Sequence, residues 1–91
     1  MPKYVIERNF PGAAKLSPGE LRDIAAKSVG VLREMGPDVQ WVESYVAEDK
    51  IYCVYNAKNP ELVREHAKRG GFPADKVCRV SAVIDPTTAE K

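Results

Sequence analysis

Two helix-start signals punctuate this sequence, and together they fix the order of its secondary-structure elements. The first, Ser17-Pro18-Gly19-Glu20, combines an N-cap serine, a proline suited to the first helical position and the glutamate of a capping box. The second is Asn59-Pro60. Apolar residues follow each signal at helical spacing, and each run ends at a glycine stop, Gly36-Pro37 and Gly70-Gly71. The sequence therefore predicts two helices, each between a start signal and its glycine stop.

Four segments around these helices have the composition or the alternation of strands. They cover Lys3 to Arg8, Gln40 to Ala47, Lys50 to Asn56 and Lys76 to Asp85. The resulting order, β-α-β-β-α-β, predicts an α+β, ferredoxin-like fold: a four-stranded antiparallel sheet with two helices on one face. A chain of 91 residues has room for one such domain, spanning 1–91, and its polar end, Pro86 to Lys91, is expected to be frayed.

The central hairpin predicts what each face of the sheet carries. If Glu48-Asp49 is a two-residue turn, Ser44 opposes Cys53 and Tyr45 opposes Tyr52. The face under the helices then carries Val42, Ser44, Val46, Ile51, Cys53 and Tyr55, and the helix-free face carries Trp41, Glu43, Tyr45, Tyr52, Val54 and Asn56. An uncovered aromatic row is typical of an interface, so we expect a homodimer, a dimeric α+β barrel formed through the helix-free face.

His66 is the only histidine, and it lies on the apolar stripe of the second predicted helix. Its ring should point at the sheet, where it could meet Cys53. An imidazole and a thiolate are suited to nickel, copper or zinc, and the same two groups could also act as a nucleophile and its base. A buried histidine bonded to the backbone beside an inert thiol is the structural alternative.

Glu43 is the second candidate, because it interrupts an otherwise apolar strand between Trp41 and Tyr45. A carboxylate on an interface needs a partner, which could be Arg79 on the fourth strand or a metal ion. Glu7 on the first strand could join Glu43 and add the oxygen ligands that a first-row cation accepts.

Charge and motif content exclude several classes of function. The chain has 14 Lys+Arg and 13 Asp+Glu, so its net charge of +1 suits neither nucleic acid nor an anionic membrane. No apolar run at its N-terminus is long enough to predict a signal peptide, no segment predicts a membrane span, and the common phosphate-binding and hydrolase motifs do not occur. Its two cysteines, Cys53 and Cys78, are too few for a disulfide scaffold. These features predict a cytoplasmic protein with no nucleic-acid or membrane partner.

The stretch WVESYVAEDKIYCVYNAKNPELVREHAKRGGFP, with the opening MPKYVIERNFPGA and the cap SPGEL, resembles a family of small bacterial nickel-binding proteins with a ferredoxin-like fold. The resemblance spans roughly Lys3 to Asp85. Its most specific part is a Y-x-V-Y-x-A…H-A core, carried here by Tyr52, Val54, Tyr55, Ala57, His66 and Ala67. The resemblance implies a dimeric α+β barrel and nickel as a possible ligand, with His66 and Cys53, then Glu43 and Tyr45, as metal-ligand candidates.

Together these observations predict a homodimer that binds or sequesters a transition metal, nickel above all, rather than an enzyme. A small cofactor-free enzyme of the monooxygenase or isomerase type is the first alternative, with His66 as acid or base and a closed pocket between helices and sheet. The second alternative is a ligand-free interaction module. This would be favoured if His66 and Glu43 both proved to be fully paired within the protein.

Overall fold

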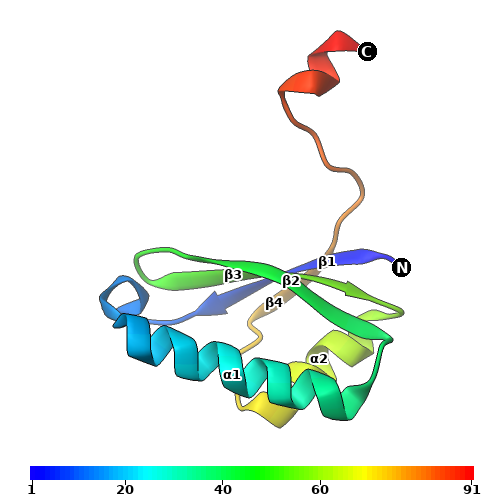
Figure 1. The fold of residues 1–91 in the computed structure, drawn as a ribbon. Helices are drawn as coiled ribbons and strands as arrows, with labels where there is room; N and C mark the ends of the chain where they lie inside the picture. Colours follow the sequence, from blue (N-terminus) through cyan, green and yellow to red (C-terminus); the bar gives the residue numbers. More distant parts are fainter.

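The four strands form one antiparallel sheet in the order β2-β3-β1-β4 in the computed structural model, which describes residues 1–91 (Figure 1). Strands β3 and β1 are therefore central, and β2 and β4 are the edges. The elements are β1 (Lys3–Asn9), α1 (Pro18–Met35), β2 (Val39–Val46), β3 (Lys50–Ala57), α2 (Pro60–Gly70) and β4 (Lys76–Arg79), with short 3-10 helices at Ala13–Lys15 and Pro86–Glu90. The predicted order of elements and the ferredoxin-like arrangement are confirmed.

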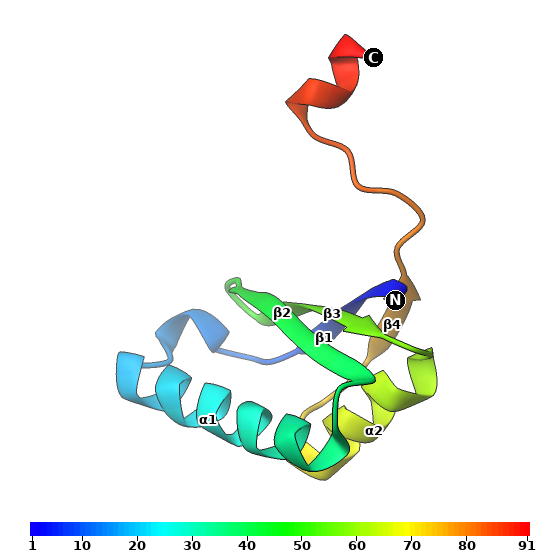
Figure 2. The same ribbon diagram turned by 45° about the vertical axis from the view of Figure 1, so that its right-hand side comes forward.

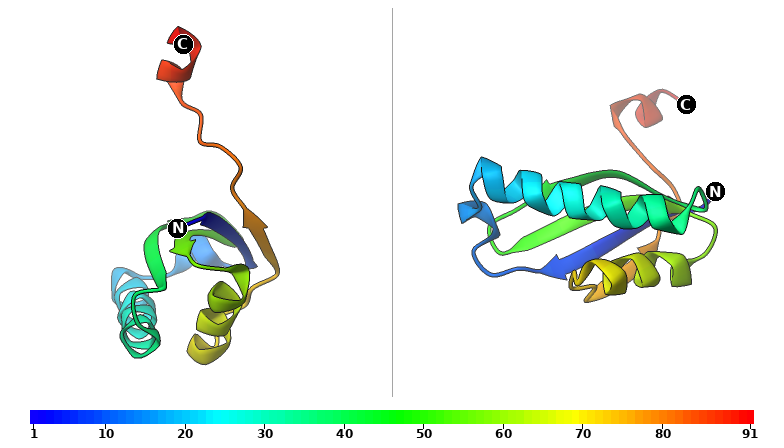
Figure 3. Two further views of the ribbon diagram at one scale, coloured as in Figure 1. Left: turned by 90° about the vertical axis from the view of Figure 1, so that its right-hand side faces the viewer. Right: turned by 60° about the horizontal axis from the view of Figure 1, so that its bottom comes forward.

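Both helices lie on one face of the sheet and leave the other face free of helices (Figures 2 and 3). Helix α1 contacts β2, and α2 contacts β3, β4 and α1. After β4 the chain leaves the sheet on the helix-free side and extends away from it (Figure 3). No helix in the structure has the length and apolar character needed to cross a membrane.

The helix ends form where the sequence places them, because each end is closed by local hydrogen bonds. Ser17 Oγ accepts from the backbone N–H of Glu20 at 3.1 Å, and the Ser17 N–H donates to Glu20 Oε1 at 3.0 Å. Asn59 Oδ1 accepts from the Leu62 N–H at 3.0 Å. Gly71 ends α2 with a φ of 70°, a left-handed conformation that glycine adopts without a steric penalty.

The hairpin of β2 and β3 follows the predicted register except at one point. Ser44 pairs with Cys53 and Tyr45 with Tyr52, as expected, but a β-bulge follows Trp41. Trp41 pairs with Tyr55 and the next residue to pair is Glu43, so the bulge leaves out Val42.

The bulge exchanges the predicted faces of Trp41 and Val42. Trp41 lies on the helix side, half-buried, with Nε1 donating to Ser44 Oγ at 2.9 Å. Val42 lies exposed on the helix-free side. The prediction that Trp41 belongs to the helix-free face is therefore wrong, because regular alternation was assumed along the whole strand.

Strand β4 is shorter than the predicted Lys76–Asp85 segment and ends at Arg79. Its last ladder contact is the Val80 N–H to the Lys3 carbonyl oxygen at 2.8 Å. The neighbouring strand β1 begins at Lys3, and the carbonyl oxygen of Pro2 accepts from the Ala57 N–H on the other side, so residues after Val80 form no further ladder bonds with β1. At the C-terminal end, Asp85 caps the short 3-10 helix Pro86–Glu90, which has no buried residue.

The core lies between the central strands and the helices. Alternate residues of β1 and β3 point toward the helices and are buried there, including Tyr4, Ile6, Ile51, Cys53 and Tyr55. Helix α2 covers them with Val63, His66 and Ala67, which are also buried. This packing brings the helix-side candidates, His66 and Cys53, into the interior of the domain.

Candidate functional site on the two faces of the sheet

The four residues suggested as metal ligands lie on opposite faces of the sheet. His66 and Cys53 are buried on the helix side. Glu43 and Tyr45 are exposed on the helix-free side. Nowhere in the chain do three His, Cys, Asp or Glu side chains converge as a metal site would require. One chain therefore does not bring all four together, and each pair has to be considered by itself.

His66 is fully buried and faces α1 rather than Cys53. Its Nε2 lies 3.2 Å from Ser28 Oγ and 3.4 Å from the Ser28 carbonyl oxygen, while Nδ1 is buried without a hydrogen-bond partner. The rings of Tyr55 and Phe72 pack against it, with centroids 5.2 and 5.9 Å away. Burial lowers the pKa of His66, the bond to Ser28 opposes this, and the charge of Arg8 lowers the pKa further. His66 is therefore held as a neutral imidazole.

Cys53 contacts a buried cation. Arg8 Nε donates to Cys53 Sγ at 3.3 Å, Nη2 donates to the Tyr55 hydroxyl at 3.2 Å, and Nη1 donates to the Pro73 carbonyl oxygen. Arg8 itself is only 4% exposed. A metal ion bound by Cys53 or His66 would lie close to this guanidinium and be repelled by it. The helix-side pair therefore does not fit a site for a divalent cation.

A cavity of about 270 Å³ lies beside these residues, between α1 and the sheet. Its wall is mainly apolar: Ile24 and Ala25 from α1, and Trp41, Ile51 and Tyr55 from the sheet. Arg8 and Cys53 supply polar atoms to the same wall. This arrangement can hold an organic molecule. The cavity lies between helix and sheet, where the enzyme alternative places its pocket, but the exposed Leu21 and Val46 border it, so it is not closed.

Arg8 is not among the predicted site residues, although the sequence carries a signal for it. Arg8 has the same alternation parity as Tyr4 and Ile6, the buried residues of β1. A charged residue in phase with the core-facing positions of a strand predicts a buried charge. This position in the alternation is a more specific criterion for a site residue than the rarity of a residue type, on which the choice of His66 and Cys53 depended.

On the helix-free face, the Tyr45 hydroxyl donates a hydrogen bond to Glu43 Oε2. This bond to a carboxylate raises the pKa of Tyr45, so the phenol stays protonated. Apolar side chains from β1, β2, β3 and the segment after β4 line a hollow around the pair, among them Val5, Val42, Val54 and Val83. Glu43 and Tyr45 thus present a carboxylate and a phenol at the surface, two oxygen-donor groups that a first-row divalent cation accepts.

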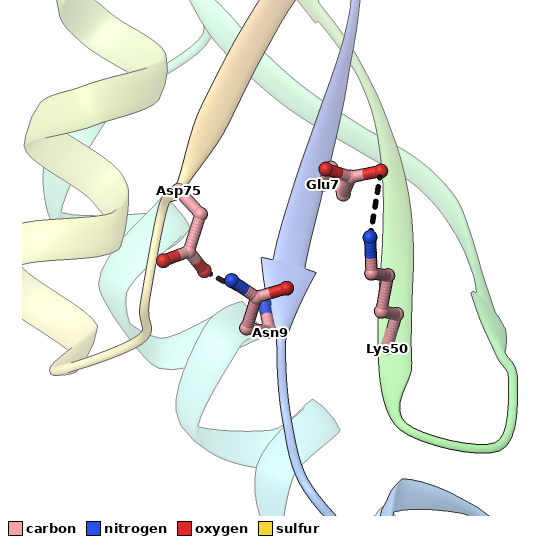
Figure 4. Close-up of polar contacts among 4 residues, drawn as sticks. All are labelled: Glu7, Asn9, Lys50 and Asp75. Atoms are coloured by element: carbon pink, nitrogen blue, oxygen red, sulfur yellow. Dashed lines mark hydrogen bonds and ion pairs between the residues drawn. The ribbon is translucent and has the colours of Figure 1, made fainter.

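The partners suggested for Glu43 lie elsewhere in the sheet. Arg79 is in β4, at the edge opposite β2, and forms no ion pair with Glu43. Glu7 in β1 is engaged by Lys50, with Nζ and Oε1 3.4 Å apart, as Figure 4 shows. Figure 4 also shows Asp75, which accepts from the Asn9 N–H at 2.6 Å and so ties the segment before β4 to β1. Glu43 is therefore bonded only to Tyr45 within its own chain.

Two comparisons with known proteins find matches. A family model described as "Nickel responsive protein SCO4226-like" matches residues 4–80, most of the chain. The crystal structure of SCO4226 from Streptomyces coelicolor A3(2) aligns with a TM-score of 0.74 over 90% of this chain and 99% of that chain, at 18% sequence identity. At that identity the likeness shows the fold alone. No curated protein matches the chain.

Proposed function

Because the chain belongs to the SCO4226-like family of nickel-responsive proteins, we propose that it binds a divalent transition metal, nickel above all, through Glu43 and Tyr45 on its helix-free face. The observation that carries this proposal is the Glu43–Tyr45 pair itself: a carboxylate with no positive partner, at the surface, beside a second oxygen donor. The bound metal would supply a positive charge that the pair lacks. Sites of this oxygen-donor type favour nickel over manganese, iron and cobalt, in line with the general affinity order of first-row cations.

One copy of the chain supplies too few ligands, which supports a site shared between two copies. Nickel takes more ligands than one carboxylate and one phenol provide, and water or a second protein chain has to complete the set. The same face also has exposed large side chains: Val42 is 47% exposed and Tyr45 is 56% exposed. In the segment after β4, Val83 and Ile84 are exposed as well. Pairing two helix-free faces would cover these side chains and bring two Glu43 carboxylates to one interface. A homodimer is therefore part of the proposal.

The structure bears differently on the two alternative functions that the sequence left open. The ligand-free module is not favoured, because His66 Nδ1 lacks a partner and Glu43 is bonded only to another exposed side chain. The alternative that places an organic molecule on the helix side has a cavity to support it.

Nickel titration calorimetry on tag-free protein tests the metal proposal. We expect Glu43→Gln to weaken nickel binding by at least about 10-fold, since the amide is uncharged and a poorer ligand. Glu34→Gln is the matched control, because Glu34 is exposed on α1, on the other side of the domain, and loses the same charge. Equal nickel affinities of the two variants would refute the proposal.

A further inference from the structure

Arg8 is a buried cation with no anionic partner. The residue is 4% exposed, and the two ion pairs of the chain, Lys50–Glu7 and Arg69–Glu65, do not involve it. Its acceptors are a thiol sulfur, a phenol oxygen and a backbone carbonyl oxygen, and the ring of Phe72 lies 5.5 Å from Cζ. A buried charge that is not neutralised is costly, so this arrangement favours the entry of an anion.

Two of the five N–H groups of Arg8 have no hydrogen-bond acceptor within the protein. Nε donates to Cys53, Nη1 to Pro73 and Nη2 to Tyr55, one bond each. A guanidinium has five N–H donors, so one remains on each of Nη1 and Nη2. Two donors are the number that a bidentate carboxylate accepts, and such charge-assisted pairs are among the strongest hydrogen bonds in proteins.

The size and the apolar wall of the cavity that Arg8 lines limit what the rest of the ligand can be. Its wall is mainly apolar, and its volume of about 270 Å³ lies just below the roughly 300–1,000 Å³ of typical small-molecule sites. An apolar body can fill the space between Ile24 and Ala25 of α1 and Trp41 of β2. A phosphate or a sugar would leave several polar atoms unpaired against this wall.

We propose that this cavity binds a small organic carboxylate with an apolar body, whose carboxylate group pairs with Arg8. The site is on the helix side and is independent of the metal proposal for Glu43 and Tyr45. It is also distinct in ligand charge, since an anion binds on this face and a cation is proposed on the other.

Trp41 gives a direct readout, because it is the only tryptophan and lines the cavity. Tag-free protein is titrated with cyclohexanecarboxylate and with cyclohexanecarboxamide, which have the same shape and differ in charge. We expect the carboxylate to change Trp41 fluorescence and to bind at least about 10-fold more tightly than the amide. Equal binding of the two, or binding of neither at millimolar concentration, would overturn the proposal.

Two substitutions locate the site. Arg8→Met removes the charge and retains an apolar side chain, and should reduce the preference for the carboxylate over the amide to less than about 2-fold. Ala25→Phe fills the cavity while Arg8 itself is retained, and it should abolish the response to the carboxylate. The matched control is Ala26→Phe, the adjacent residue of α1, which is exposed. Retained carboxylate binding in Ala25→Phe contradicts the proposal even if Arg8→Met does not fold.

Discussion

The ring of Phe72 lies directly against the backbone of Gly70: a Cβ atom at Gly70 would come within 2.3 Å of Phe72 Cε2. The same ring packs against His66, with centroids 5.9 Å apart, and against the guanidinium of Arg8 at 5.5 Å. The absent side chain of Gly70 therefore lets one aromatic ring contact both the buried imidazole and the buried cation.

The contrast between Gly70 and Gly30 gives the first prediction. Gly70→Ala should lower stability by about 1–3 kcal/mol, because Phe72 has to move out of a packed position. Gly30→Ala should instead raise stability by about 0.5–1 kcal/mol, because Gly30 lies within α1 and its Cβ would meet nothing within 4 Å. Thermal melts should show shifts of opposite sign, at about 4–8 °C per kcal/mol for a domain of this size. Two shifts of the same sign would contradict this assignment.

His66→Asn should lower stability and leave nickel affinity unchanged. His66 is fully buried against Tyr55 and Phe72, and the smaller side chain loses part of that packing. We expect a loss of about 1–3 kcal/mol. Calorimetry with nickel and a thermal melt on the same sample separate this outcome from a ligand role, for which nickel affinity would fall while the fold remained stable.

The neutral state of His66 predicts how stability depends on pH. Its pKa in the folded protein is lower than the 6.5 of an exposed histidine. Below about pH 6.5 the unfolded chain therefore binds a proton that the folded chain does not, and the free energy of unfolding falls as pH decreases. Above that pH both states are neutral and this contribution is constant. Urea unfolding between about pH 7.5 and 5.5 should show this decrease in the original protein and a smaller one in His66→Asn.

The proposed dimer predicts a specific effect of Val42→Glu. Light scattering of the original protein should give about twice the mass of one chain, and the buried charge in the variant should give a monomer. Trp41 is not suited to this test because it lies on the helix side. The control is Val29→Glu, which places the same charge at an exposed valine of α1. A monomeric original protein, or a dimer that persists in Val42→Glu, would exclude the helix-free face as the interface.

Tyr45→Phe separates the two members of the proposed metal site. The phenol stays protonated beside Glu43, so it can position the carboxylate and bind a metal only weakly. We expect nickel affinity to fall by less than the at least 10-fold loss expected for Glu43→Gln. Tyr52→Phe is the control, since Tyr52 pairs with Tyr45 across the hairpin and forms no side-chain hydrogen bond to Glu43. A loss as large as that of Glu43→Gln would make Tyr45 an equal ligand.

The fold was predictable where local bonds determine it. The capping residues Ser17 and Asn59 and the left-handed Gly71 act within one helical turn, and all three were identified in the sequence. The end of β4 was not predictable in the same way. It depends on Lys3, far away in the chain, because β1 supplies the last pairing partner.

The site was predictable only in part. The residue alternation correctly placed Cys53 on the helix side and Glu43 with Tyr45 on the other side. The approach of α1 to α2 lies beyond such periodicity, and it determines that His66 meets Ser28 instead of Cys53. Arg8 is not rare as a residue type, and only its position in phase with the core-facing residues of β1 indicates that it is buried.

The bulge at Val42 has a consequence for how this chain tolerates the loss of a residue. Val42 is the unpaired residue between Trp41 and Glu43, so its deletion would restore a regular ladder and leave every other side chain of the hairpin on its present face. A deletion at Ser44 would close the same bulge but turn Glu43 toward the interior. In related proteins, β2 can therefore lose one residue at Val42 while all other side chains of the hairpin keep their face of the sheet. The loss of one residue at Ser44 would instead move a carboxylate from the surface into the core.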